Sequence, residues 1–150
     1  MRYGEFKRGI ISQTEGQIKK HYSQFSKEEY LFLKNKLQNL NKKRIVESYH
    51  LSIKFIVYDI DVVKELPYKD DIYIIEYNET PTRDYIDRRI LVRSKESYDV
   101  NIKGKIIKCN LCVVFSIVTN EIITIYWNKE NDNHRTLNTT RYNKDLKIIY

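Results

Sequence analysis

Glycine and cysteine are scarce in this sequence, and the motifs built on glycine are missing. With four glycines in 150 residues, the chain has no glycine-rich phosphate-binding loop, no nucleophile elbow and no dinucleotide-binding fingerprint. No stretch approaches the roughly 18 apolar residues that a membrane-spanning helix needs. The first residues, Met1–Glu5, do not resemble a signal peptide. These absences exclude the commonest nucleotide-binding and hydrolase classes, and we expect a cytoplasmic protein with no membrane partner.

The two cysteines, Cys109 and Cys112, do not predict a metal or redox site. They lie in a strand-like run, where residues three apart point to opposite faces of a sheet. A zinc site needs a second pair of ligands, and Asp132 with His134 is a weak pattern for a metal. We therefore expect two reduced thiols in or near the core, with no metal ion and no cofactor.

Positive charge is in excess, with 27 Lys and Arg against 20 Asp and Glu and a net charge of +7. This excess favours a polyanionic partner through long-range attraction to phosphates, although extra lysine can also be no more than a solvated surface. Thirteen tyrosines can supply stacking surfaces for unpaired bases, but AT-rich codons favour the same residue types. RNA or a ribonucleoprotein is the partner that we expect.

The chain divides into an irregular N-terminal segment, residues 1–25, and a single domain, residues 26–150. Glycines interrupt any regular pattern in the first segment. At Ser26 a capping box begins, with Glu29 three residues later, and apolar side chains at helical spacing follow it. We expect a helix over residues 27–40.

Two further helical segments precede the strands. The apolar spacing predicts a second helix over residues 42–57. A short third helix over residues 62–66 is capped by Asp59 or Asp61, and Pro67 ends it.

After Pro67 the apolar period changes from 3.6 residues to two, which predicts β-strands. Strands are expected over residues 72–77 and 88–94, in a hairpin around Thr119–Glu121, in an extension over 98–102 and at a small edge over 146–150, with residues 78–87 as a loop. Helices followed by such strands indicate an α+β fold. The prediction is two to three N-terminal helices packed on a four- to five-stranded antiparallel sheet.

The second strand of the hairpin has two different sides. The apolar side is expected to carry Ile123, Ile125 and Trp127, and the other side to carry Ile122, Thr124, Tyr126 and Asn128. A sheet needs such a strand when one face packs on helices and the other meets a ligand.

Polar and cationic residues converge on the second side in this scheme. His50 and Lys54 share a helix face, Arg89 and Arg93 share a strand face, and His134 and Arg135 follow the hairpin. Cleavage of RNA without a metal needs a base, an acid and a cation for the phosphate, and these residue types can supply them.

Each candidate also has an ordinary structural explanation. A lone His50 on an amphipathic helix is more often a boundary or core residue, and Thr124 and Tyr126 are consistent with exposed strand positions. His134 lies in a loop whose Asn and Asp residues are typical of turns.

The segment from about His50 to Tyr142 resembles the barnase/EndoU/colicin/RelE group of small RNA-cleaving toxin domains. The resemblance is carried by the helix with His50 and Lys54, the strand Arg88–Arg93, the hairpin with Ile123–Tyr126 and the residues Asp132–His134. It implies helices followed by an antiparallel sheet that bears the site. The catalytic roles of that group would fall on His50, Lys54, Arg93, Thr124, Tyr126 and His134.

The leading hypothesis is a metal-independent ribonuclease, or a toxin-like relative, acting on RNA. His50, His134, Arg93, Thr124 and Tyr126 would be its catalytic residues. Lys54, Arg88, Arg89 and Arg135 would contact the nucleic acid. The alternative is a non-catalytic inhibitor from a phage or other mobile element, which binds nucleic acid or a ribonucleoprotein. A cognate inhibitor or a target protein is a further expected partner.

Overall fold

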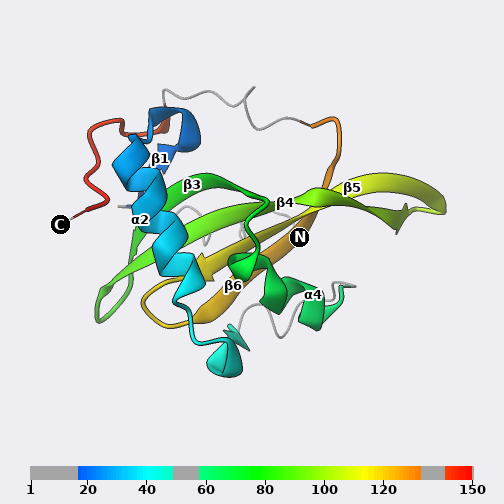
Figure 1. Ribbon diagram of the computed structural model, residues 1–150, viewed down its shortest axis with the longest axis horizontal. Coiled ribbons are helices and arrows are strands. Elements are labelled where there is room, and N and C mark those ends of the chain that lie inside the picture. Colours follow the sequence, from blue (N-terminus) through cyan, green and yellow to red (C-terminus); the bar gives the residue numbers. More distant parts are fainter. Residues whose placement is uncertain (1–16, 49–57, 133–140, 150) are drawn as a thin grey trace, which may run out of the picture.

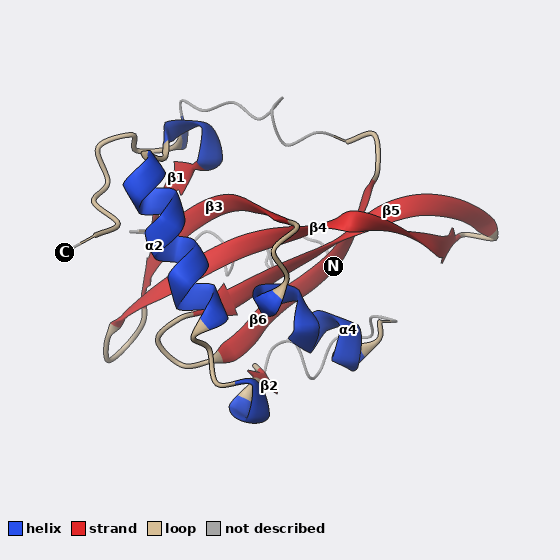
Figure 2. Ribbon diagram, in the orientation of Figure 1, coloured by secondary structure: helices blue, strands red, loops and turns tan. Residues whose placement is uncertain are grey.

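The computed structural model describes residues 17–48, 58–132 and 141–149, and a six-stranded sheet forms its centre (Figure 1). The strand order is β1 (Ile18–His21), β3 (Ile72–Pro81), β4 (Ile86–Ile102), β5 (Lys105–Ser116), β6 (Glu121–Lys129) and β2 (Val46–Glu47). Neighbouring strands are antiparallel, except that β2 runs parallel to β6. Two α-helices, α2 and α4, lie on one face of this sheet, as Figure 2 shows.

The first predicted helix is confirmed in α2, Lys27–Gln38. The Ser26 hydroxyl accepts a hydrogen bond from the Glu29 N–H at 3.0 Å, and the Glu29 carboxylate accepts one from the Ser26 N–H at 2.9 Å. This capping box satisfies main-chain donors that the first helical turn leaves unpaired. Leu33 and Leu37 then face the sheet and are fully buried.

The short third helix is also present, as α4, Ile60–Glu65. Asp59 caps it by accepting a hydrogen bond from the Asp61 N–H at 2.9 Å. Pro67 lies in the 3-10 turn η3, Leu66–Tyr68, that follows.

The predicted arrangement of two to three N-terminal helices on a four- to five-stranded antiparallel sheet was wrong. Where a second helix was expected, the chain forms the 3-10 turn η2, Lys42–Arg44, and then the strand β2, Val46–Glu47, which makes the sheet mixed. Val46 and Glu47 are both exposed and pair with Glu121 and Ile122 of β6. Pairing with β6 therefore overrides the helical spacing, and residues 49–57 lie outside the described part of the chain.

Strand β1, Ile18–His21, falls in the segment over residues 1–25 that was predicted to be irregular. It pairs antiparallel with residues Glu76–Glu79 of β3 and is followed by the 3-10 turn η1, Tyr22–Gln24. The four residues of β1, two of which are lysines, have no strong preference for a strand in their own sequence. Pairing with β3 therefore decides their conformation.

Strands β3, Ile72–Pro81, and β4, Ile86–Ile102, are longer than predicted. The expected loop over residues 78–87 is mostly paired, and only a tight connection remains, in which the Thr82 hydroxyl accepts a hydrogen bond from the Tyr85 N–H. Pro81 is tolerated because it ends its strand, beyond the pairing with β1.

The predicted hairpin is confirmed in β5, Lys105–Ser116, and β6, Glu121–Lys129. Asn120 has a φ of 65°, the left-handed conformation that asparagine tolerates. The expected extension over residues 98–102 is confirmed too, since β4 and β5 continue as a two-stranded arm that projects from the sheet (Figure 1).

A β-bulge in the β5–β6 pairing changes which residues of β6 face the helices. Val114 pairs with Thr124 and Phe115 pairs with Ile122, so Ile123 is the extra residue. Ile122 is therefore fully buried in the main core, where strict alternation placed Ile123. Thr124 and Tyr126 lie on the predicted side of β6, whereas Ile122 and Ile123 have exchanged sides.

The main core lies between the helices and the sheet, and the C-terminal segment contributes to it. Leu146 and Ile148 are buried in this core without forming the expected edge strand. The Lys20 ammonium donates to the Leu146 carbonyl at 3.1 Å and to both oxygens of Glu29 at 2.8 and 2.9 Å. One buried lysine thus ties the C-terminal segment to the start of α2.

Candidate functional site

We use the name polar face for the side of the sheet opposite the two helices. Arg93 of β4 pairs with Cys112 of β5, and Cys112 pairs with Tyr126 of β6. Residues directly opposite each other in antiparallel strands point to the same face. The structure therefore brings Arg93 and Tyr126 onto one face, as the sequence predicted, with Cys112 between them.

Arg93 is engaged by the protein itself. Its side chain donates to the Asn110 side-chain oxygen at 2.7 and 3.2 Å, and to the main-chain carbonyls of Asp132 at 2.6 Å, Lys129 at 3.1 Å and Glu130 at 3.4 Å. Only 6% of the residue is exposed. A phosphate would have to displace these acceptors, so this geometry is that of a clamp on the end of β6.

The thiol of Cys112 and the phenol of Tyr126 interact beside this clamp. Burial raises the pKa of Cys112 to about 11, although the Arg93 charge and the Tyr126 hydroxyl act in the opposite direction. Burial also raises the pKa of Tyr126, and the nearby Cys112 and Glu76 raise it further. Both groups therefore keep their protons near neutral pH. The Cys109 and Cys112 thiols are free and buried, which confirms the expectation for them.

A second polar cluster joins β1, β3 and the C-terminal segment. The Tyr142 hydroxyl donates to Glu76 at 2.8 Å, and the Lys19 ammonium lies 4.0 Å from the same carboxylate. The His21 ring is packed 5.2 Å from the Tyr142 ring and accepts from the Ser23 N–H through Nδ1. Burial, followed by the Glu76 charge, raises the pKa of Tyr142.

This cluster was not predicted from the sequence. A bulge at Ile75 sets which face Glu76 occupies, and His21 lies in the segment that was treated as irregular. The sequence feature that could have indicated this cluster is Glu76, the single carboxylate within the strongly β-forming run Ile72–Tyr77.

Arg88 and Arg89, which were predicted to contact nucleic acid, also donate hydrogen bonds within the protein. The Arg88 guanidinium donates to the Tyr77 hydroxyl at 2.7 Å and to the Ile148 carbonyl, on the helix side of the sheet. Arg89 donates to the buried Asp87 carboxylate at 2.6 Å. Both arginines hold the fold together in this geometry.

The remaining predicted site residues, His50, Lys54, His134 and Arg135, lie outside the described residues. Within the described ranges, no group of three or more His, Cys, Asp or Glu side chains is placed to hold a metal ion. Nor do those ranges contain a helix of the length and apolar character that a membrane crossing requires.

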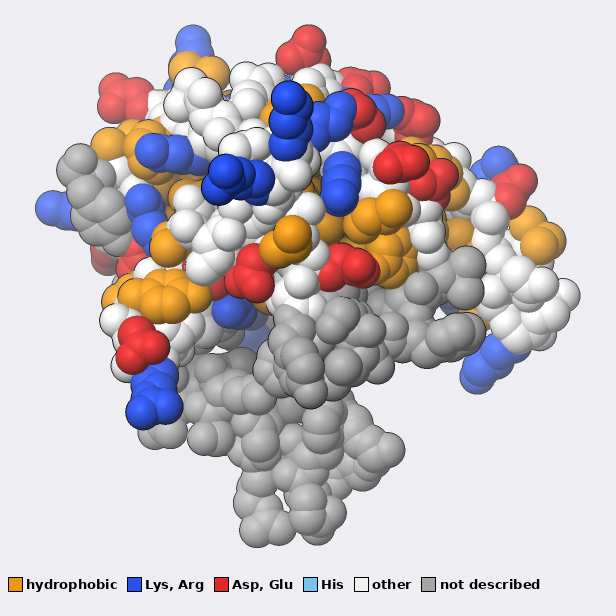
Figure 3. Space-filling model, turned by 90° about the horizontal axis from the view of Figure 1, so that it is seen from below, with side chains coloured by type: hydrophobic (Ala, Val, Ile, Leu, Met, Phe, Trp, Pro, Cys, Tyr) orange, Lys and Arg blue, Asp and Glu red, His pale blue; other side chains and the backbone are white. Residues whose placement is uncertain are grey.

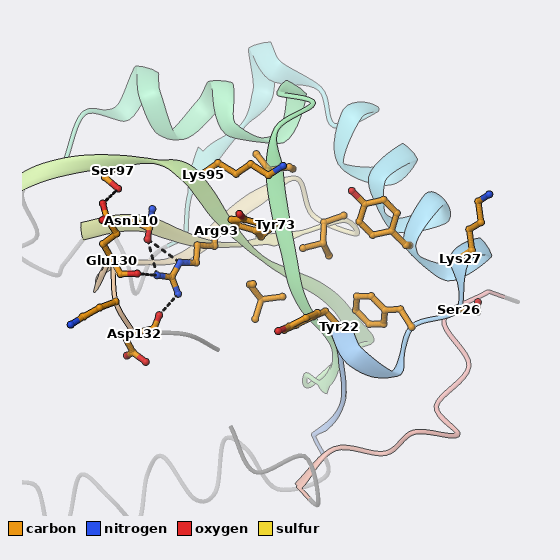
Figure 4. A pocket seen from close by; sticks show the side chains of 16 residues that line it. Tyr22, Ser26, Lys27, Tyr73, Arg93, Lys95, Ser97, Asn110, Glu130 and Asp132 are labelled. Carbon is orange, nitrogen blue, oxygen red and sulfur yellow. Dashed lines mark hydrogen bonds between the residues drawn. The ribbon is translucent and has the colours of Figure 1, made fainter. Parts of the chain in front are cut away.

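A cleft of about 1020 Å³ lies around the first half of β3. Figure 4 shows this strand between the start of α2 on one side and the Arg93 clamp on the other. The lining includes the aromatic residues Tyr22, Phe25, Tyr30 and Tyr73, the lysines Lys27 and Lys95, and the acidic residues Glu130 and Asp132. The acidic residues lie at the Arg93 end, so the cleft is mixed in charge.

Exposed cations gather at the opposite edge of the sheet, beside β2. Three successive residues of η2, Lys42, Lys43 and Arg44, are exposed. Lys42 pairs with Glu65, and its ammonium lies 5.6 Å from the centre of the Tyr68 ring. Figure 3, which views the molecule from below, shows several Lys and Arg side chains close together, with acidic side chains beside them.

No family model, no curated protein and no solved structure matches this chain. The resemblance to the RNA-cleaving toxin domains therefore stays a prediction.

Proposed function

We propose that this is a non-catalytic cytoplasmic protein that binds RNA or a ribonucleoprotein through the basic edge formed by η2. The observation that carries the proposal is the contrast between two groups of cations. The arginines of the sheet are occupied by internal acceptors, whereas Lys42, Lys43 and Arg44 are exposed side by side. Exposed cations can bind phosphates without the loss of buried hydrogen bonds.

The ion pair of Lys42 with Glu65 does not oppose this function. Both side chains are about half exposed, at 49% and 50%. An exposed pair of this kind contributes little to stability, so a phosphate can replace the carboxylate. Tyr68, whose ring lies under the Lys42 ammonium, adds an aromatic surface next to the cations.

The test is binding of labelled single-stranded RNA at salt concentrations from about 50 to 200 mM. The triple variant Lys42→Gln, Lys43→Gln, Arg44→Gln removes three cations from η2. We expect it to bind more weakly and to reduce the slope of log affinity against log salt by about 2 to 3, because each neutralised phosphate contributes about 0.7 to 0.9.

A matched control removes three exposed cations elsewhere, through Arg141→Gln, Lys144→Gln and Lys147→Gln. The control has the same net charge as the η2 variant and should keep a slope close to that of the wild type. Equal effects of the two variants, or no RNA binding at low salt, would overturn the proposal.

A metal-independent ribonuclease is the second candidate. It is favoured by the row of Arg93, Cys112 and Tyr126 across three strands, with Thr124 on the same strand face as Tyr126. In this proposal His50 and His134 transfer protons, and Thr124 and Tyr126 position the RNA.

Cleavage of labelled tRNA and of ribosome-bound mRNA in EDTA distinguishes the two functions. A ribonuclease leaves cut ends, whereas a binding protein returns its RNA intact. Cleavage that is equal in the wild type, His50→Ala and His134→Ala would exclude both histidines from the site.

A further inference from the structure

Within residues 17–48, 58–132 and 141–149, strand pairing covers only half of the outer edge of β3. Strand β1 pairs with residues Glu76–Glu79 and then turns away into η1. Among the described residues, no strand lies beside Ile72–Ile75 on that side. Main-chain groups in this stretch that point away from β4 therefore have no strand partner in the described part of the chain.

This free edge has the composition that natural proteins normally cover. The four residues Ile72-Tyr73-Ile74-Ile75 are all strong strand formers, with no proline or charge to discourage pairing. Tyr73 is 50% exposed. The bulge at Ile75 limits the regular edge to about four residues, or about 13 Å.

The cleft of about 1020 Å³ follows this edge and offers a different surface on each side. Phe25 and Tyr30 line it on the side of α2, together with the inward-facing Ile74. On the other side, the Lys95 ammonium lies 5.1 Å from the centre of the Tyr73 ring. Figure 4 shows Lys95 and Tyr73 next to each other, and Lys27 at the start of α2.

We propose that an extended segment of an acidic partner protein adds to the sheet at Ile72–Ile75, in line with β1. A strand edge presents alternating N–H and carbonyl groups, which another polypeptide strand matches along its length. Alternate side chains of the added strand would lie against Phe25 and Tyr30. The side chains between them would be acidic and would face Lys95, while Lys27 adds positive charge at the α2 side of the cleft.

Two observations favour this occupant over the others. A second copy of the chain would also carry a charge of +7, and like charge opposes edge-to-edge association. A nucleic acid has no main-chain amide and carbonyl groups to match those of the strand edge. The site is separate from the basic edge at η2, because β3 and β2 lie toward opposite edges of the sheet.

The test uses a synthetic peptide that alternates valine with glutamate. One control peptide carries lysine in place of glutamate, and another has the same acidic sequence with N-methylated main-chain amides. Binding is measured by titration, and amide hydrogen exchange reports protection at Ile72–Ile75. We expect the acidic peptide to bind and to protect these amides, and both control peptides to fail.

A charge-reversed variant, Lys27→Glu with Lys95→Glu, changes two exposed residues. It should bind the acidic peptide about tenfold more weakly, as expected for two exposed ion pairs replaced by repulsion. The matched control Lys144→Glu with Lys147→Glu should bind as the wild type does. The η2 variant should keep peptide binding, which separates this inference from RNA binding.

Three results would overturn the inference. The first is the absence of peptide binding, and the second is equal binding of the N-methylated peptide. The third is a dimer of the free protein with slow exchange at Ile72–Ile75, which would assign the edge to a second copy of the chain.

Discussion

Replacement of Arg93 by alanine tests whether this residue stabilises the fold or serves a ligand. The substitution removes the donor for the Asn110 side chain and for three carbonyls of residues 129–132. Glu130 and Asp132 are exposed, so water can reach that part of the chain, whereas Asn110 is only 6% exposed. Leaving a buried acceptor unpaired and losing hydrogen bonds from a charged donor together cost about 3 kcal/mol.

The measurement is equilibrium unfolding in urea. With a slope of about 2 kcal/mol/M, a loss of about 3 kcal/mol lowers the midpoint by about 1.5 M. Arg93→Lys keeps the charge but not the planar fork, so its loss should be intermediate. Lys95→Ala, an exposed change two residues along the same strand, is the control and should shift the midpoint little. A loss below about 1 kcal/mol for Arg93→Ala would refute the clamp and return the guanidinium to the candidate catalytic residues.

Two further predictions follow from the hairpin. Asn120 bridges to Asn41, accepting from its N–H and donating to its carbonyl, both at 2.9 Å. Asn120→Gly keeps the left-handed conformation but loses both hydrogen bonds, so it should lower the free energy of unfolding in urea by about 1 kcal/mol. Asn120→Val adds backbone strain and should lower it further. Equal losses for the two variants would contradict this reasoning. The pKa of Cys112 is raised from its ordinary 9.0 to about 11, so the folded state holds the thiol proton more tightly. The associated stability is fully present below pH 9 and is lost as pH rises through about 11. The unfolding midpoint of the wild type should therefore fall over this range, and that of Cys112→Ala should fall less; parallel curves would exclude Cys112 as a cause.

Local chemistry predicted several elements correctly. The capping box of Ser26 and Glu29 begins α2 because both its partners lie within one helical turn. Asn120 was predicted to form a turn because its own backbone tolerates the left-handed conformation. The same locality explains the opposite faces of Cys109 and Cys112, which follow from their spacing alone.

The candidate site was predicted only in part. Alternation within β4 and β6 was enough to place Arg93 and Tyr126 on one face. Alternation did not reveal that Asn110 and the carbonyls of residues 129–132 accept hydrogen bonds from Arg93, because those acceptors belong to other segments. The Glu76 and Tyr142 pair joins residues 66 positions apart and has no local signal.

Residues close together in the chain were enough to predict where α2 begins, where the hairpin turns, and that a β-rich region follows Pro67. The tertiary structure decided that residues 46–47 join the sheet as β2, that Ile18–His21 pair with β3, and that Ile122 faces the core in place of Ile123. The physical reason is that main-chain pairing with a distant strand outweighs the weak preferences of a short segment. A single extra residue in a bulge then exchanges the two faces of a strand.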